Sequence, residues 1–109
     1  MKHSLIAAAL ACTAVFGTTA HAQNYPNKPI KMIVPYAAGG GVDAIARQLA
    51  KKTGEALGQS VTVDNRPGAG AIIGLDAVAK APGDGYTILF TAGSSINLNP
   101  HVYKKLPYD

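Results

Sequence analysis

Apolar residues along this chain fall into short continuous runs that alternate with stretches in which they recur every three or four positions. The first continuous run, 30–34, predicts a β-strand that is buried on both faces, as in a parallel sheet, and Pro35 ends it. After three consecutive glycines, apolar residues recur from Val42 to Leu57 at helical spacing, which predicts an amphipathic helix. Gly58 is a natural C-terminal cap for that helix.

The same alternation continues in the second half of the chain. A run at 60–65 predicts a second strand, and the glycine-rich turn 66–71 leads into an expected helix at 72–81. A Pro-Gly-Asp-Gly sequence stops that helix, and the following run at 86–91 predicts a third strand. The polar, small-residue stretch 92–100 is expected to be a loop.

The order strand-helix-strand-helix-strand predicts an α/β fold with a parallel sheet and right-handed crossovers. A second crossover that returns past the first strand gives the strand order 2-1-3. Ligands of such sheets bind beyond the carboxyl ends of the strands, near the point where the order reverses. Three junctions, 35–43, 66–71 and 91–97, are expected to meet there, and two of them are rich in glycine.

Residues 1–22 have the features of a secretory signal peptide. Lys2 precedes a short apolar stretch, and small residues lead up to an expected cleavage after Ala22. The apolar stretch is too short to span a bilayer core of about 30 Å, and a buried N-terminal helix is the alternative. Cleavage would remove Cys12, the single cysteine, so residues 23–109 would form neither a disulfide nor a cysteine-ligated metal site.

Residues 23–109 carry nine Lys and Arg against six Asp and Glu, a net charge of +3. The basic residues are scattered rather than gathered in a stripe with aromatic residues, so the pattern does not favour nucleic-acid binding. A mild positive charge is compatible with an anionic small ligand. The chain stops directly after an expected loop, and we expect 23–109 to be the N-terminal part of the first lobe of a longer protein.

An exported oxidoreductase that binds a dinucleotide is the main alternative. Gly39, Gly41 and Ala44 fit a G-x-G-x-x-G/A pattern, and Asp64 lies about twenty residues further on, where such proteins bind a ribose. Against this reading, residues 35–38 separate the strand from the glycines, so the tight turn onto a pyrophosphate is lost. Export would also remove the protein from the nicotinamide pool.

The sequence offers little for catalysis. It contains neither a P-loop nor a G-x-S-x-G nucleophile motif. His101 is the single histidine after residue 22, and no candidate partner stands at an informative spacing from it. The His, Asp and Glu residues form no cluster with metal-ligand spacing. We therefore expect no metal, no cofactor and no enzymatic activity.

The remaining feature is a main chain that can bind an anion. Glycines let backbone N–H groups approach a ligand closely, and a helix N-terminus adds partial positive charge. Two glycine turns and one Ser/Asn loop at a single sheet edge favour a binding site over simple tight turns. A carboxylate or another small oxyanion is the expected ligand.

Four segments are the most specific in the chain: PYAAGGGVD, VDNRPGAG, PGDGYT and YKKLPYD. Together they resemble the tripartite tricarboxylate transporter receptor family, the Bug-type periplasmic solute-binding proteins, and the resemblance covers essentially all of 23–109. It implies one part of a two-lobed, type II-like binding protein in the periplasm, a monomer at full length. Such a protein delivers a small carboxylated solute to membrane permease subunits.

The family pattern carries over onto all three junctions, and it implies that the first two hold a ligand carboxylate, partly through ordered water. The expected ligand contacts are Gly39, Gly40, Gly41, Gly68, Ala69, Gly70, Ser94, Ser95 and Asn97. Asp43 is expected to cap the first loop without touching the anion, because two like charges about 4 Å apart repel. Val42 and Ala71 depart from the pattern, since family members often have a hydroxyl residue and a glycine at these positions.

Overall fold

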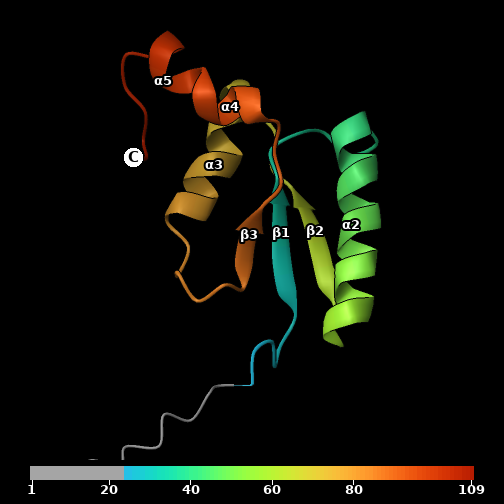
Figure 1. Cartoon of the computed structure of the whole chain (residues 1–109). Helices are drawn as coiled ribbons and strands as arrows, with labels where there is room; N and C mark the ends of the chain where they lie inside the picture. The colour runs from blue at the N-terminus through green and yellow to red at the C-terminus, as the bar shows by residue number, and fades with distance from the viewer. Residues whose placement is uncertain (1–23) are drawn as a thin grey trace, which may run out of the picture.

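The computed structural model describes residues 24–109, and the expected signal peptide with its cleavage site lies outside them. A three-stranded sheet carries one helix on each face, and two short helices follow its last strand (Figure 1). None of the described helices is long and apolar enough to cross a membrane. The elements in chain order are β1 (Ile30–Val34), α2 (Gly41–Leu57), β2 (Val61–Asn65), the 3-10 turn η2 (Ala69–Ala71), α3 (Ile72–Ala79), β3 (Thr87–Leu89), α4 (Gly93–Asn97) and α5 (Asn99–Val102).

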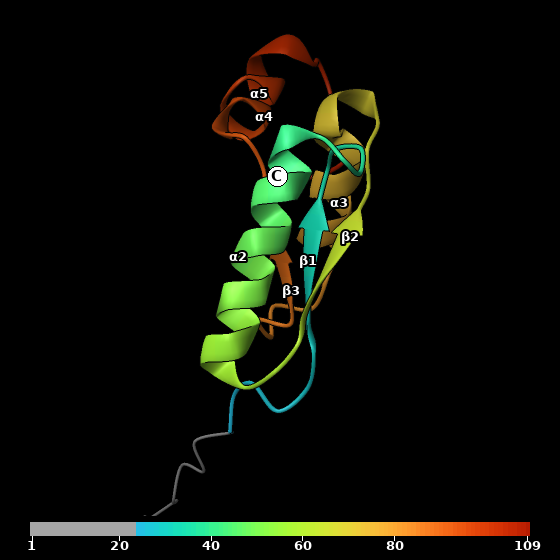
Figure 2. The same cartoon turned by 90° about the vertical axis from the view of Figure 1, so that its right-hand side faces the viewer.

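The sheet has the predicted parallel topology, with the strand order β2-β1-β3. At the centre of the register, Met32 of β1 lies between Val63 of β2 and Ile88 of β3. The two crossovers run in opposite directions across the sheet, so right-handed connections place α2 and α3 on opposite faces, as Figures 1 and 2 show. β1 is therefore covered on both sides, which explains its continuous apolar sequence.

The main core lies between β1 and α2. Met32 and Val34 of the strand pack with Ala46 and Ala50 of the helix, and all four are at most 4% exposed. The small alanine side chains let the helix lie close to the sheet. Ile33 points to the opposite face by strand alternation, and Leu75 of α3 is buried there as well.

Several element boundaries differ from the sequence-based expectation. α3 ends at Ala79, and β3 covers only Thr87–Leu89, although the Phe90 N–H still donates to a β1 carbonyl oxygen at 3.0 Å. The stretch 92–100, for which the sequence predicts a loop, contains α4 and the start of α5. Pro100 favours this outcome because its fixed φ suits the first turn of a helix, but the long-range contacts that hold both helices have no local signature.

The segment before β1 is fastened to the amino end of the sheet. The Tyr25 hydroxyl donates to the Gly85 carbonyl oxygen at 2.6 Å, and the Tyr25 ring meets the Tyr86 ring edge-on with centroids 5.0 Å apart. The Lys28 ammonium lies 4.4 Å from the centre of the Tyr86 ring, a cation–π arrangement. The described chain thus enters the fold at the end opposite α4 (Figure 1).

Candidate ligand site

The three junctions meet at the carboxyl end of the sheet, as the sequence predicts (Figure 1). We call them loop 1 (35–40), loop 2 (66–71) and loop 3 (90–92, which continues into α4). Hydrogen bonds connect them in a ring: Asn65, the residue directly before loop 2, bonds to loop 1, loop 2 bonds to α5, and loop 3 with α4 bonds to loop 1. The ring holds three separate segments of the chain in one arrangement.

Asp43 lies in the first turn of α2 and is 3% exposed. Its carboxylate accepts hydrogen bonds from Arg47 Nε at 2.9 Å, the Gly39 N–H at 2.8 Å and the Asn65 side-chain amide at 2.9 Å. The bond from Arg47 contributes most to lowering the pKa of this carboxyl from 3.8 to about 2. The carboxylate is therefore charged at neutral pH and links loop 1 to α2 and β2.

The contribution of Asp43 to stability is expected to depend on pH. Because its pKa is lower in the folded protein than in the unfolded chain, the stabilisation is complete above about pH 4 and is lost as the pH falls through about 2. Between these values the free energy of unfolding of Asp43→Asn should change less than that of the wild type. Urea denaturation at a series of pH values measures both, and parallel curves would contradict the assignment.

Loop 2 has an unusual backbone. Ala69, Gly70 and Ala71 have φ angles of 49°, 64° and 74°, so three consecutive residues are left-handed, a region that glycine alone adopts routinely. The loop is tied to β1 where it begins, because the Arg66 N–H donates to the Val34 carbonyl oxygen at 2.8 Å. Its exposed main chain therefore starts from a fixed point at the end of the central strand.

Asn65, the last residue of β2, joins loop 2 to loop 1. Its side-chain amide nitrogen donates to the Asp43 carboxylate and to the Tyr36 carbonyl oxygen at 3.1 Å. Its amide oxygen accepts a hydrogen bond from Arg47 at 3.0 Å. Because both donors and the acceptor of this amide are engaged, the side chain has one orientation and the two loops keep a fixed spacing.

The Tyr36 hydroxyl joins loop 1 to loop 3. It lies 3.1 Å from the Thr91 hydroxyl and 2.7 Å from the Ser95 hydroxyl, and it accepts the Ala92 N–H at 3.2 Å. Burial alone would raise the pKa of this phenol, but the hydrogen bonds with these three residues outweigh burial, and the pKa of Tyr36 is lowered. The arrangement leaves Ser95 only 8% exposed.

Eight of the nine expected ligand contacts are exposed at this end of the molecule, and Ser95 is the exception. The sequence reasoning missed Tyr36, Asn65 and Asn99, which hold the loops together. A polar residue at a strand end is a weak signal for Asn65. The bonds of Tyr36 and Asn99 instead join residues 55 and 29 positions apart along the chain, so a local pattern could not reveal them.

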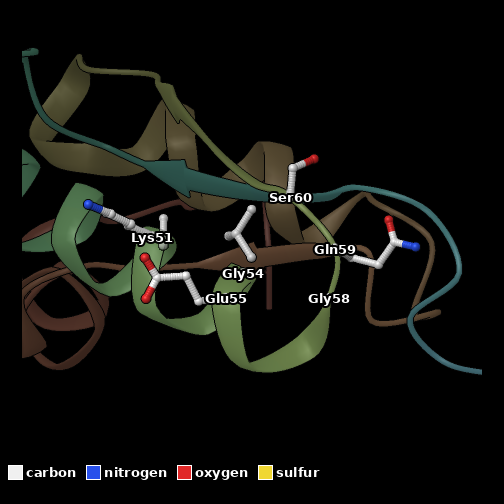
Figure 3. A pocket seen from close by; sticks show the side chains of 8 residues that line it. Lys51, Gly54, Glu55, Gly58, Gln59 and Ser60 are labelled. Carbon is white, nitrogen blue, oxygen red and sulfur yellow. The ribbon is translucent and has the colours of Figure 1, made fainter.

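A separate hollow lies at the other end of the sheet, between the last turns of α2 and the start of β2 (Figure 3). Lys51, Glu55 and Gln59 are among the residues that line it. Gly54 allows the chain to return tightly here, since a β-carbon at this position would lie 3.0 Å from the Gln59 carbonyl oxygen. We interpret this open hollow as a surface depression formed where the chain turns tightly from α2 into β2, and not as a ligand site.

The fold and the loops define a class of protein. Parallel α/β sheets bind ligands beyond the carboxyl ends of their strands, and this end presents glycine backbone, a hydroxyl and an amide. The buried acid, Asp43, is engaged with a backbone N–H and two side chains. Across residues 24–109, no group of three or more His, Cys, Asp and Glu could hold one metal ion. The class that these features define is a parallel α/β lobe whose candidate ligand site lies at the carboxyl end of its sheet.

Comparison with known proteins shows the family. Residues 45–109 match the sequence model of the tripartite tricarboxylate transporter family receptor, and the chain belongs to this family. It is 46% identical over 91 residues to a UPF0065 protein of Bordetella pertussis, an alignment that covers 84% of this chain and 28% of that relative. The chain thus spans little more than a quarter of the relative's length.

Solved structures share the fold. A periplasmic transporter is 44% identical with a TM-score of 0.74, and the match covers 78% of this chain and 29% of that one. Rpa4515 of R. palustris, solved with adipate, is 36% identical with a TM-score of 0.65 over 78% and 28% of the two chains. MatC from Rhodopseudomonas palustris, with bound malate, is 34% identical with a TM-score of 0.58 over 60% and 22%. The predicted family and α/β fold are confirmed.

Proposed function

We propose that the protein carrying this chain is a receptor that binds a small carboxylated solute and delivers it to the membrane permease of a tripartite tricarboxylate-type transporter. The observation that carries the proposal is the exposed glycine backbone of loops 1 and 2 beside the N-terminus of α2, in a chain of this family. The adipate and malate bound to two structurally similar proteins support a carboxylate as the ligand.

The start of α2 supplies the first donors. Gly40 is the N-cap of this helix and no side chain caps it, so the N–H groups of the first turn can receive an oxyanion. The Gly39 N–H donates to Asp43, and the Gly40 N–H donates to the Ala37 carbonyl oxygen at 3.5 Å. The Gly41 N–H, at the first residue of α2, is therefore the donor that this proposal assigns to the ligand. The negative charge of Asp43 is matched by Arg47 at 2.9 Å, so it stabilises the loop without repelling the ligand strongly.

Loop 2 and α4 supply the remaining contacts in this proposal. Gly68, Ala69 and Gly70 of loop 2 are exposed. The exposed side chains of Ser94 and Asn97 on α4 offer a hydroxyl and an amide, which suit the polar groups of a substituted carboxylic acid. We assign Ser95 to holding Tyr36, because its hydroxyl lies 2.7 Å from the phenol.

The dinucleotide alternative is less well supported. A pyrophosphate would have to lie against the glycine turn at Gly39, whose N–H here donates to the Asp43 carboxylate. Asp64, the candidate ribose acid, is paired with Arg66 at 3.1 Å. The family match and the carboxylates bound to similar proteins both favour the receptor over an oxidoreductase.

The cellular setting of the receptor belongs to the same proposal. We place it in the periplasm as a monomer, after removal of residues 1–22, with 23–109 forming the N-terminal part of the first of two lobes. The similarity to a periplasmic transporter supports this location. N-terminal sequencing of the protein recovered from a periplasmic extract tests the cleavage, and a mature chain that does not begin at residue 23 would contradict it.

Small carboxylates are expected to raise the melting temperature of the full-length mature protein. A ligand at 100 times its Kd stabilises the folded state by about 2.7 kcal/mol. Thermal unfolding with adipate, malate, tricarboxylates, aromatic acids and amino acids measures the shift, with NAD as the probe of the alternative. A panel of acids without effect, together with a shift by NAD, would overturn the proposal.

A further inference from the structure

Loop 2 keeps a conformation that its sequence does not favour. Ala69 and Ala71 have φ angles of 49° and 74°, in the region where the β-carbon of an L-residue crowds the following carbonyl oxygen. Strained residues of this kind persist only where the surrounding structure holds them, and they cluster at sites that bind ligands. Contacts from outside the loop must therefore hold it.

The segment around α5 supplies these contacts. Asn99, the first residue of α5, is 7% exposed, and its side-chain amide donates to the Gly70 carbonyl oxygen at 3.0 Å. Tyr103 packs on the same residue, because a β-carbon at Gly70 would lie 2.6 Å from the Tyr103 hydroxyl oxygen. The Tyr103 N–H donates to the Asn99 carbonyl oxygen at 3.0 Å, so the two side chains act from one fixed turn.

The bond from Asn99 sets the orientation of one peptide group in loop 2. In a trans peptide the C=O and N–H point in opposite directions. Because the Gly70 carbonyl is turned towards α5, the Ala71 N–H is turned away from α5. We propose that Asn99 and Tyr103 are positioning residues that keep loop 2 in the left-handed shape in which its backbone receives the ligand carboxylate. The proposal rests on the proposed function for the nature of the ligand.

The same helices connect loop 2 to the rest of the ring. The Leu98 N–H donates to the Ser94 carbonyl oxygen at 2.8 Å, and the Val102 N–H donates to the Leu98 carbonyl oxygen at 3.1 Å, so α4 and α5 are both hydrogen-bonded to Leu98, the residue between them. Ser95 of α4 is bonded to Tyr36 of loop 1. A ligand group that contacts α4 can therefore also affect how firmly Asn99 holds loop 2.

The test is made on the full-length mature protein. It has two readouts. The first is the Kd for adipate, or for the acid with the largest thermal shift, measured by calorimetry; the second is amide hydrogen exchange across 66–72 without ligand. Asn99→Ala and the isosteric Asn99→Asp both remove the donor to Gly70. Each is expected to speed exchange in loop 2 by about tenfold and to weaken binding by about tenfold.

Relief of strain separates positioning from a general loss of stability. Ala71→Gly allows the left-handed φ without crowding, so it should recover affinity in the Asn99→Ala background. We expect Ala71→Gly to change the Kd about threefold more in the Asn99→Ala background than in the wild type. Independent sites do not show such coupling. Tyr103→Phe keeps the ring against Gly70 and should weaken binding less than Tyr103→Ala does.

His101→Ala, an exposed change on the same helix, is the matched control and should leave both readouts within about twofold of the wild type. The proposal is overturned by unchanged exchange in both Asn99 variants, by faster exchange with unchanged affinity, or by equal effects of Ala71→Gly in the two backgrounds. If the wild type binds no acid of the panel, the proposed function fails, and exchange alone decides whether Asn99 holds loop 2.

Discussion

Gly40→Val is expected to abolish carboxylate binding while the protein remains folded. Gly40 has φ −77° and ψ 171°, which any residue adopts, and a β-carbon there would meet only the Ala37 carbonyl oxygen, at an ordinary 3.5 Å. The valine methyl groups would instead occupy the space before the first N–H groups of α2. Affinity should fall by about 100-fold or more, equivalent to about 2.7 kcal/mol. Stability should fall by no more than about 1 kcal/mol, because valine is a poorer N-cap than glycine.

Two further glycines make this experiment specific. Gly83→Val introduces the same side chain into open space at the other end of the sheet, and it should leave affinity unchanged. Gly39 has φ +87°, so Gly39→Val should lose stability as well as affinity. Calorimetry and thermal unfolding of the three variants separate these effects. Affinity of Gly40→Val within about threefold of the wild type would mean that the backbone of loop 1 does not face the ligand.

Gly74→Ala should destabilise the protein by about 1–3 kcal/mol through overpacking. Inside most helices the same change stabilises by roughly 0.5–1 kcal/mol, so the expected sign is reversed. Gly74 is buried in α3, and a β-carbon there would lie 2.6 Å from Pro35 Cβ and 3.1 Å from the Arg66 carbonyl oxygen. These atoms belong to the starts of loops 1 and 2, which the added methyl group would push apart.

Gly83→Ala is the matched control for this change, because a β-carbon at Gly83 meets no atom within 4 Å. Its free energy of unfolding should stay within about 0.5 kcal/mol of the wild type. Urea denaturation of both variants measures the difference. A Gly74→Ala protein as stable as the wild type would show that α3 does not pack against Pro35 as closely as the structure indicates.

The sequence alone predicts the sheet well, because the pattern of this region follows directly from burial. The continuous apolar run 30–34 predicts a strand covered on both faces, and β1 lies between α2 and α3 as the central strand. Gly58 predicts the end of α2 and has the left-handed φ of +67° that such a cap needs. Both predictions depend on residues close together in the sequence, which is where pattern reasoning is strongest.

The contacts that hold the three loops together could not be predicted in the same way. Tyr36 follows a buried strand, and from the sequence it is one more partly apolar residue. Its hydroxyl nevertheless forms hydrogen bonds with Thr91, Ala92 and Ser95. Ser95 reads as an exposed loop hydroxyl and is buried against that phenol. The stretch 92–100 lacks a strong helical pattern, and its helices depend on contacts with loops 1 and 2. Each of these features arises from residues that are distant in the sequence.

Ala71 shows how a departure from a family pattern acquires a physical meaning. Family members often have glycine at this position, and in the structure Ala71 has a φ of 74°. Glycine adopts that angle without crowding, whereas alanine does so with strain. From the sequence, this substitution indicates only a different side chain; the backbone angle shows that it concerns the shape of loop 2.

The anchoring of the segment before β1 has a practical consequence for handling this protein. Tyr25 and Lys28 fasten that segment to Tyr86 at the amino end of the sheet, while the three loops lie at the carboxyl end. A sensor surface that holds the protein through a tether ahead of Asn24 would therefore present the loops to the solution. Coupling through lysine amines would also attach molecules through Lys104, which directly follows Tyr103. The loops of those molecules would then face the support.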